Sequence, residues 1–138
     1  IMDTKPNILL VDDDELYLYL MEKTIQQLSK ELIVTTFTDG EQAVEYIAEC
    51  TAQKMELPEV IFLDINMPFL DGWGFLNEFK KLKPKIINNI NIYMVSSSMR
   101  DSDIKRASHF EELTGYVVKP VNKTQLAEIF KKIYHENW

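Results

Sequence analysis

Four short apolar runs in this chain end abruptly at charged or polar side chains. Continuous apolar stretches of this length are typical of strands buried on both faces of a parallel sheet. In an open α/β sheet, ligands bind beyond the carboxyl ends of the strands. The residues that end the runs are therefore expected to meet at one edge of the sheet and to form a site there. The runs, each followed by the residues that end it, are 8–11 before Asp12 and Asp13, 60–63 before Asp64, 92–95 before Ser96, and 116–118 before Lys119.

Segments with the apolar spacing of a helix separate these runs. Leu18, Met21 and Ile25 recur at steps of three and four residues, which places them on one helix face. Residues 33–37, rich in β-branched side chains, predict one more strand. Strand and helix alternate five times, and this order predicts a doubly wound α/β fold: a five-stranded parallel sheet with helices on both faces, joined by right-handed crossovers.

Three local signals predict where helices begin or end. Residues 38–41 resemble a capping box, and Asn122 with Gln125 three positions later forms a second one. The helix that begins at Gly72 is expected to stop at Pro84, because proline removes a backbone donor and clashes with the preceding turn.

The length of 138 residues predicts a single domain, over residues 5–136, with no output domain after it. No apolar stretch approaches the roughly 20 residues needed to span a membrane, and no signal peptide is visible, so a cytoplasmic protein is expected. The net charge of −7 argues against direct binding of a nucleic-acid backbone. Cys50 is the single cysteine, which excludes an intramolecular disulfide.

Asp12, Asp13 and Asp64 are expected to lie together at the carboxyl edge of the sheet. Two unit charges about 4 Å apart repel by roughly 4 kcal/mol at an effective dielectric constant near 20. A cluster of three carboxylates therefore either raises a pKa or binds a cation. Ligands that are all oxygen suit a hard ion, and Mg²⁺ needs only one or two carboxylates besides water and a substrate phosphate.

Lys119 and Ser96 add the groups that a phosphoryl-transfer site needs. The ammonium of Lys119 can hold a phosphoryl oxygen, and Ser96 offers a hydroxyl donor. Catalysis of phosphoryl transfer consists mostly of positioning and of neutralising charge. Carboxylates can serve as the nucleophile and form aspartyl phosphates. Asp64 is the predicted nucleophile, because it stands alone at its strand end whereas Asp12 and Asp13 form a pair.

Four motifs in this order resemble the receiver domains of response regulators in two-component signalling, over essentially the whole chain. Each motif alone is weak, but their order and spacing together are specific. They are Asp12 and Asp13 after an apolar run, the loop of residues 64–68 followed by Asp71 and Gly72, Ser96 and Ser97 after Val95, and Lys119 and Pro120 after residues 115–118.

The resemblance implies a flavodoxin-like fold with strand order 2-1-3-4-5, and it implies roles for the acidic residues. Asp64 would accept a phosphoryl group from a sensor histidine kinase or a His-containing phosphotransfer protein. The implied cofactor is Mg²⁺, bound directly by Asp13, largely through water by Asp12, by Asp64, and by the backbone carbonyl of Asn66.

The resemblance also implies a switch. Ser96 would move toward the phosphoryl group and Tyr116 would rotate inward behind it. Lys119 would pair with the acceptor at rest and with the phosphate afterwards, and a cis peptide bond would precede Pro120. The chain would then act as a signalling switch that assists its own phosphorylation and dephosphorylation, rather than as an enzyme. Its partners would be the kinase and a downstream protein target, and it would be a monomer or a phosphorylation-dependent dimer.

Three other functions remain open at this point. A haloacid-dehalogenase-like phosphatase also uses an Asp nucleophile with Mg²⁺, and Asp12 with Asp14 fits its Asp-x-Asp pattern, although a late acidic pair is missing. A flavodoxin-like mononucleotide binder would place phosphate after the first strand, where three aspartates repel it. A receiver used as a scaffold would not need phosphorylation. Residues 106–114 are bulkier and more acidic than this family usually shows. The resemblance therefore does not predict where the fourth helix ends or which partner the chain binds.

Overall fold

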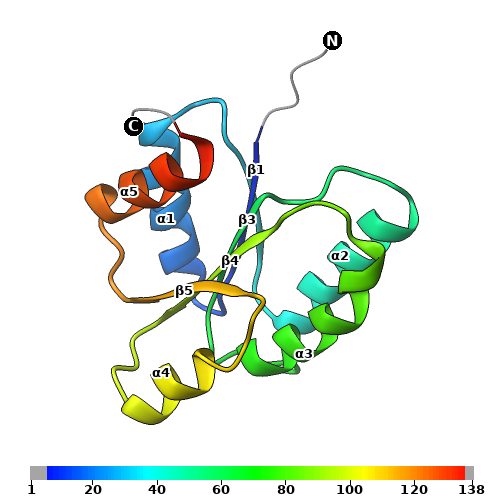
Figure 1. Ribbon diagram of the computed structural model, residues 1–138. Helices are drawn as coiled ribbons and strands as arrows, with labels where there is room; N and C mark the ends of the chain where they lie inside the picture. The colour runs from blue at the N-terminus through cyan, green and yellow to red at the C-terminus, as the bar shows by residue number, and fades with distance from the viewer. Residues whose placement is uncertain (1–5, 136–138) are drawn as a thin grey trace.

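The computed structural model describes residues 6–135, so the two ends of the predicted domain, residues 5 and 136, lie outside the described part. One parallel sheet of five strands runs through the centre of this part, in the order β2-β1-β3-β4-β5, as Figure 1 shows. This order confirms the predicted flavodoxin-like topology. The strands are β1 (Asn7–Val11), β2 (Ile33–Phe37), β3 (Val60–Leu63), β4 (Asn91–Ser96) and β5 (Leu113–Val118).

Helices cover both faces of the sheet. Helices α1 and α5 lie on one face, and α2 and α3 lie on the other (Figure 1). None of the helices in the described part is long and apolar enough to cross a membrane. The helices are α1 (Glu15–Leu28), α2 (Gly40–Ala52), α3 (Gly72–Leu82), α4 (Asp101–Ala107) and α5 (Lys123–Tyr134), with the short 3₁₀ helix η1 (Lys83–Lys85) after α3.

The sheet divides the core into two apolar clusters, and β1 contributes to both. Leu9 and Val11 point to the cluster under α2 and α3, whereas Ile8 and Leu10 point to the cluster under α1 and α5. Successive side chains of a strand point to opposite faces, so a strand covered on both faces must be apolar at every position. This packing explains why the central strands read as uninterrupted apolar runs in the sequence.

Helix caps agree with the predictions at two of three places. The capping box of Asn122 and Gln125 is present at the start of α5, and Pro84 lies in η1, directly beyond the end of α3. The capping box predicted at residues 38–41 is wrong, because it places the N-cap one residue too early, at Thr38. The N-cap of α2 is Asp39, whose carboxylate accepts a hydrogen bond from the backbone N–H of Gln42.

The unusual segment at residues 106–114 does not extend α4. That helix ends at Ala107, and β5 begins at Leu113. Trp73 of α3 stacks on Phe110 with a centroid distance of 5.7 Å, and the guanidinium of Arg106 lies 4.6 Å from the Trp73 ring. The bulk of this segment therefore packs against the start of α3.

Gly72 allows α3 to start close to the carboxyl end of β3. A Cβ atom at this position would clash with the backbone oxygen of Asp64, and the Gly72 N–H already donates to the carbonyl of Ile65 at 2.7 Å. We expect Gly72→Ala to lower the free energy of unfolding by about 1–3 kcal/mol, because rigid backbone must move to make room. Urea unfolding measures this change.

Gly74→Ala is the matched control for that substitution, two residues further along α3. Its added Cβ would meet the tip of the Leu70 side chain, which can rotate away. Alanine also favours the helix over glycine by about 1 kcal/mol. Equal destabilisation by the two alanines would contradict the backbone clash at Gly72.

Candidate functional site

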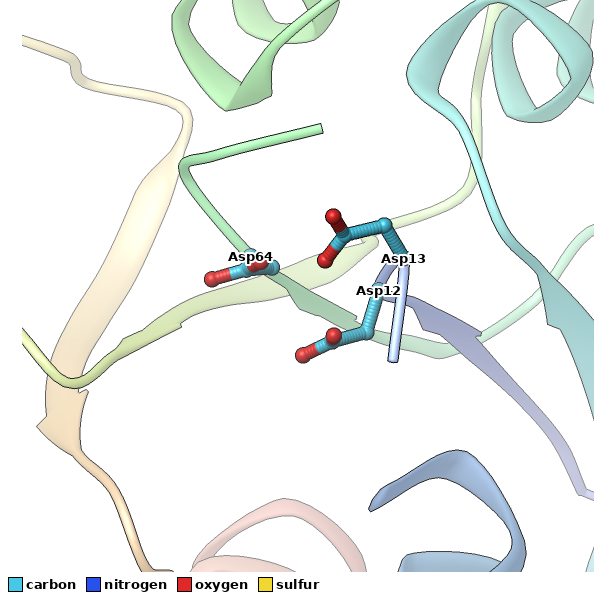
Figure 2. Close-up of side chains that lie close together, drawn as sticks. All are labelled: Asp12, Asp13 and Asp64. Atoms are coloured by element: carbon cyan, nitrogen blue, oxygen red, sulfur yellow. The ribbon is translucent and has the colours of Figure 1, made fainter. Parts of the chain in front are cut away.

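The carboxyl ends of β1 and β3 bring three aspartates together. Val11 pairs with Leu63 in the sheet, so Asp12 and Asp64 follow directly from neighbouring positions. Oxygen atoms of Asp12, Asp13 and Asp64 all lie within 4.8 Å of one another. Figure 2 shows the three carboxylates grouped beyond the ends of these two strands.

The three carboxylates differ in their surroundings. Asp12 is 3% exposed and Asp64 is 6% exposed, whereas Asp13 is open to solvent. One oxygen of Asp12 accepts a hydrogen bond from the backbone N–H of Asp14 at 2.9 Å. Asp14 itself caps α1, because its carboxylate accepts from the N–H of Tyr17 at 3.1 Å. The acidic run at the start of α1 therefore contains two site residues and one N-cap.

Lys119 brings a positive charge to this cluster from the end of β5. Its Nζ lies 2.6 Å from Oδ2 of Asp12 and 3.7 Å from Oδ1 of Asp64. Lys119 therefore contacts both buried aspartates, and its shorter contact is to Asp12. The backbone N–H of Lys119 donates to the carbonyl of Ser96 at 2.9 Å, and the peptide bond between Lys119 and Pro120 is cis, as expected.

The environment of Asp64 disfavours its ionised form relative to that of an exposed carboxylate. Burial, followed by the negative charge of Asp12, raises the pKa of Asp64 to about 6. The nearby ammonium of Lys119 and a hydrogen bond from the backbone of Ile65 act in the opposite direction, and Asp13 adds a smaller upward effect. A buried carboxylate with a raised pKa is stabilised in its charged form by an added cation.

Ser96 and Tyr116 are linked through Ser98. Ser96 is buried, and its hydroxyl oxygen accepts a hydrogen bond from the N–H of Ser98 at 3.1 Å. The Tyr116 hydroxyl donates to the carbonyl of Ser98 at 2.9 Å. The Ser98 hydroxyl donates to the carboxylate of Asp103 in α4 at 2.5 Å. The loop after β4 is therefore connected to both predicted switch residues and to α4.

Asn66 lies two residues beyond Asp64, in the loop between β3 and α3, and is exposed. Tyr17 was not predicted from the sequence, yet its ring centroid lies 4.4 Å from Nζ of Lys119. The sequence feature that could have indicated Tyr17 is its position in the first turn of α1, the helix that follows Asp12 and Asp13.

The donor set suits a hard cation. Within residues 6–135, these three aspartates are the one group of three or more Asp, Glu, His or Cys side chains close enough together to hold a metal ion. Their donors are all carboxylate oxygens, which Mg²⁺ prefers, and the exposure of Asp13 leaves room for the waters that Mg²⁺ keeps.

Comparison with known families decides what kind of domain this is. The response regulator receiver domain family matches residues 8–131. The chain belongs to this family. Receiver domains of response regulators are signalling switches in two-component systems, and the strand order and helix arrangement found here are theirs.

Similar proteins carry the receiver domain in different settings. A probable methanogenesis regulatory protein, FilR2 of Methanothrix harundinacea, is 25% identical over 131 residues, which cover 95% of this chain and 82% of that protein. The transcriptional regulatory protein PrrA of Mycobacterium tuberculosis is 30% identical over 131 residues, which cover 94% of this chain and 49% of PrrA. The chain thus spans about half the length of that relative.

Solved receiver structures superpose closely on the fold. A two-component response regulator from Cytophaga hutchinsonii has a TM-score of 0.83 and 27% identity, with 97% of this chain and all of that chain covered. The chemotaxis protein CheY4 of Vibrio cholerae has a TM-score of 0.73 and 24% identity, with 93% of this chain and 98% of that chain covered. The second comparison supports the fold alone.

Proposed function

We propose that Asp64 accepts a phosphoryl group from a phosphohistidine of a sensor histidine kinase or of a His-containing phosphotransfer protein. The observation that supports this role is the position of the Asp64 carboxylate. It lies among two further carboxylates and 3.7 Å from the Lys119 ammonium, at the carboxyl edge of a receiver fold.

The chemistry is a single displacement at phosphorus. An oxygen of the ionised Asp64 carboxylate forms the new O–P bond while the P–N bond of the phosphohistidine breaks. The electron pair of that bond stays on the imidazole nitrogen, which leaves as neutral histidine after taking up a proton. Lys119 neutralises part of the charge on the phosphoryl oxygens, and positioning of this kind accounts for most of the catalysis in phosphoryl transfer.

Asp12, Asp13 and Asp64, with the backbone carbonyl of Asn66, are the proposed ligands of Mg²⁺. When bound, the ion supplies positive charge to phosphoryl oxygens. The side chains of Asp12 and Asp64 are buried and face each other's charge, so the chain itself provides a strong preference for a cation at this place. Asp13 is exposed, so solvent can reach its carboxylate.

The proposed output is a change in protein–protein contacts. Ser96 would turn its hydroxyl to the phosphoryl group, which breaks the bond that it accepts from Ser98. Tyr116 already holds the Ser98 carbonyl, so both proposed switch residues act on one loop. The downstream partner is a protein, and the chain is proposed to act in the cytoplasm as a monomer or as a phosphorylation-dependent dimer.

Acetyl phosphate tests the acceptor directly. With Mg²⁺ present, intact-mass measurement is expected to show one adduct of phosphoryl mass on the wild-type protein. Asp64→Ala is expected to form none, because the attacking oxygen is gone. An adduct of the same mass on Asp64→Ala would assign the phosphoryl group to another residue.

The phosphatase alternative is weakened by Asp14. Its carboxylate caps α1 rather than joining Asp12 and Asp64, so the Asp-x-Asp pattern does not form a catalytic pair here. Steady release of inorganic phosphate from small phosphate esters, surviving Asp64→Asn, would nevertheless favour an enzyme over a switch.

A further inference from the structure

The aromatic ring of Tyr17 in α1 lies beside the Lys119 ammonium. Nζ lies 4.4 Å from the ring centroid, inside the distance at which an aromatic face attracts a cation. The side chain of Lys119 is 20% exposed, so this attraction acts in a place from which most water is excluded.

Tyr17 is held in place by its own neighbours. Its backbone N–H donates to the N-cap carboxylate of Asp14, which fixes the first turn of α1. Its hydroxyl lies 3.8 Å from the sulfur of Met21, one turn further along, and Met21 is buried in the core. The ring is therefore anchored at both ends and presents its face to Lys119.

The ammonium of a lysine has no preferred direction of its own, because it is a compact charge on a flexible stem. Here Asp12 and Asp64 attract it at 2.6 Å and 3.7 Å, and the Tyr17 ring contacts it at 4.4 Å. Burial and the charges of Asp12 and Asp64 also raise the pKa of the Tyr17 phenol, so the ring stays neutral.

We propose that Tyr17 is a positioning residue for phosphoryl transfer, which holds the Lys119 ammonium within reach of Asp64 by a cation–π contact. This inference rests on the proposed function of Asp64 as acceptor, and it adds a residue of α1 to the site. Tyr17 acts through Lys119 and contacts no phosphoryl oxygen itself.

Two substitutions separate the ring from the hydroxyl. Tyr17→Leu removes the aromatic face, and the initial rate of phosphorylation by acetyl phosphate is expected to fall roughly five- to tenfold. Tyr17→Phe keeps the face and loses only the contact with Met21, so its rate is expected to stay within about twofold of wild type. Equal losses in both variants would overturn the proposal.

Tyr19 provides a matched control on the same helix. Its ring also faces a lysine, with Nζ of Lys23 at 5.4 Å, but it is exposed on the surface of α1. Tyr19→Leu therefore removes a cation–π pair of the same kind, and the phosphorylation rate is expected to stay at the wild-type value. A loss as large as that of Tyr17→Leu would assign the effect to the helix rather than to the site.

A double-mutant cycle tests whether Tyr17 works through Lys119. In a Lys119→Ala background, Tyr17→Leu is expected to change the residual rate less than twofold, since the cation that the ring holds is absent. A further five- to tenfold loss in that background would show that Tyr17 acts independently of Lys119 and would overturn the proposal.

Proton NMR of the unphosphorylated protein tests the contact itself. The ε-methylene signals of Lys119 are expected to show an upfield ring-current shift in wild type and in Tyr17→Phe, and to lose it in Tyr17→Leu. An unchanged shift in Tyr17→Leu would overturn the contact. Absence of any phosphoryl adduct on wild type would instead contradict the role of Asp64, and the NMR result would still decide whether Tyr17 holds Lys119.

Discussion

Removal of Mg²⁺ by EDTA is expected to slow the phosphorylation of Asp64 by acetyl phosphate by about 10²- to 10³-fold. The acceptor lies within 4.8 Å of Asp12 and Asp13, and an incoming phosphoryl group adds further negative charge. Lys119 contacts both buried aspartates, but one positive charge does not balance three carboxylates and a phosphoryl group. A bound metal ion contributes several kcal/mol to such a transition state, which corresponds to a change of this size.

Asp13→Asn separates loss of the metal site from a general change in charge. Asp13 is exposed and belongs to the cluster, so its replacement is expected to weaken Mg²⁺ binding and slow adduct formation by at least tenfold, while excess Mg²⁺ restores part of the rate. Asp14→Asn is the control, because it removes the same charge one residue away. Asparagine also caps a helix about as well as aspartate does. Equal sensitivity of the two variants to Mg²⁺ would contradict the assignment of Asp13.

The sequence was sufficient to predict the sheet and the meeting of its strand ends. Strands β1, β3 and β4 are covered on both faces, so burial leaves an apolar residue at almost every position and marks where each strand stops. Because the carboxyl ends of neighbouring parallel strands share one edge, the aspartates after β1 and β3 had to lie together.

The contacts that individual side chains make could not be predicted from the apolar runs of the sequence. Lys119 reaches 2.6 Å from Asp12 but 3.7 Å from Asp64, a difference set by packing across four strands rather than by spacing in the chain. The sequence does not single out Tyr17, because an aromatic residue in the first turn of a helix is common and because Lys119, which it contacts, lies 102 residues further along the chain (119 − 17). The N-cap at Asp39 was missed by one position, since Thr38 is also a favoured N-cap residue type and Glu41 follows it three positions later.

Asp64→Asn is expected to stabilise the metal-free protein at pH 7 by roughly 2–3 kcal/mol. Burial and the charge of Asp12 raise the pKa of Asp64 to about 6, from about 3.9 in an unfolded chain, and each pKa unit corresponds to about 1.4 kcal/mol. The folded state therefore disfavours the ionised carboxylate that prevails at neutral pH. Asparagine carries no charge, and Lys119 keeps its shorter contact with Asp12. Urea unfolding in EDTA measures the difference.

The pH dependence of that difference gives the sharper test. Below about pH 4, Asp64 is protonated in both the folded and the unfolded wild-type protein, so the variant is expected to have almost no advantage. Between about pH 4 and pH 6 the folded state binds one proton more than the unfolded state, and wild-type stability falls relative to Asp64→Asn as the pH rises. Above about pH 6 the advantage is expected to stay constant. Asp71→Asn, which replaces the same chemical group at the exposed N-cap of α3, is the control for a general effect of removing a carboxylate. A stability difference between wild type and Asp64→Asn that is the same at pH 4 and pH 7 would mean that the acidic cluster does not perturb Asp64.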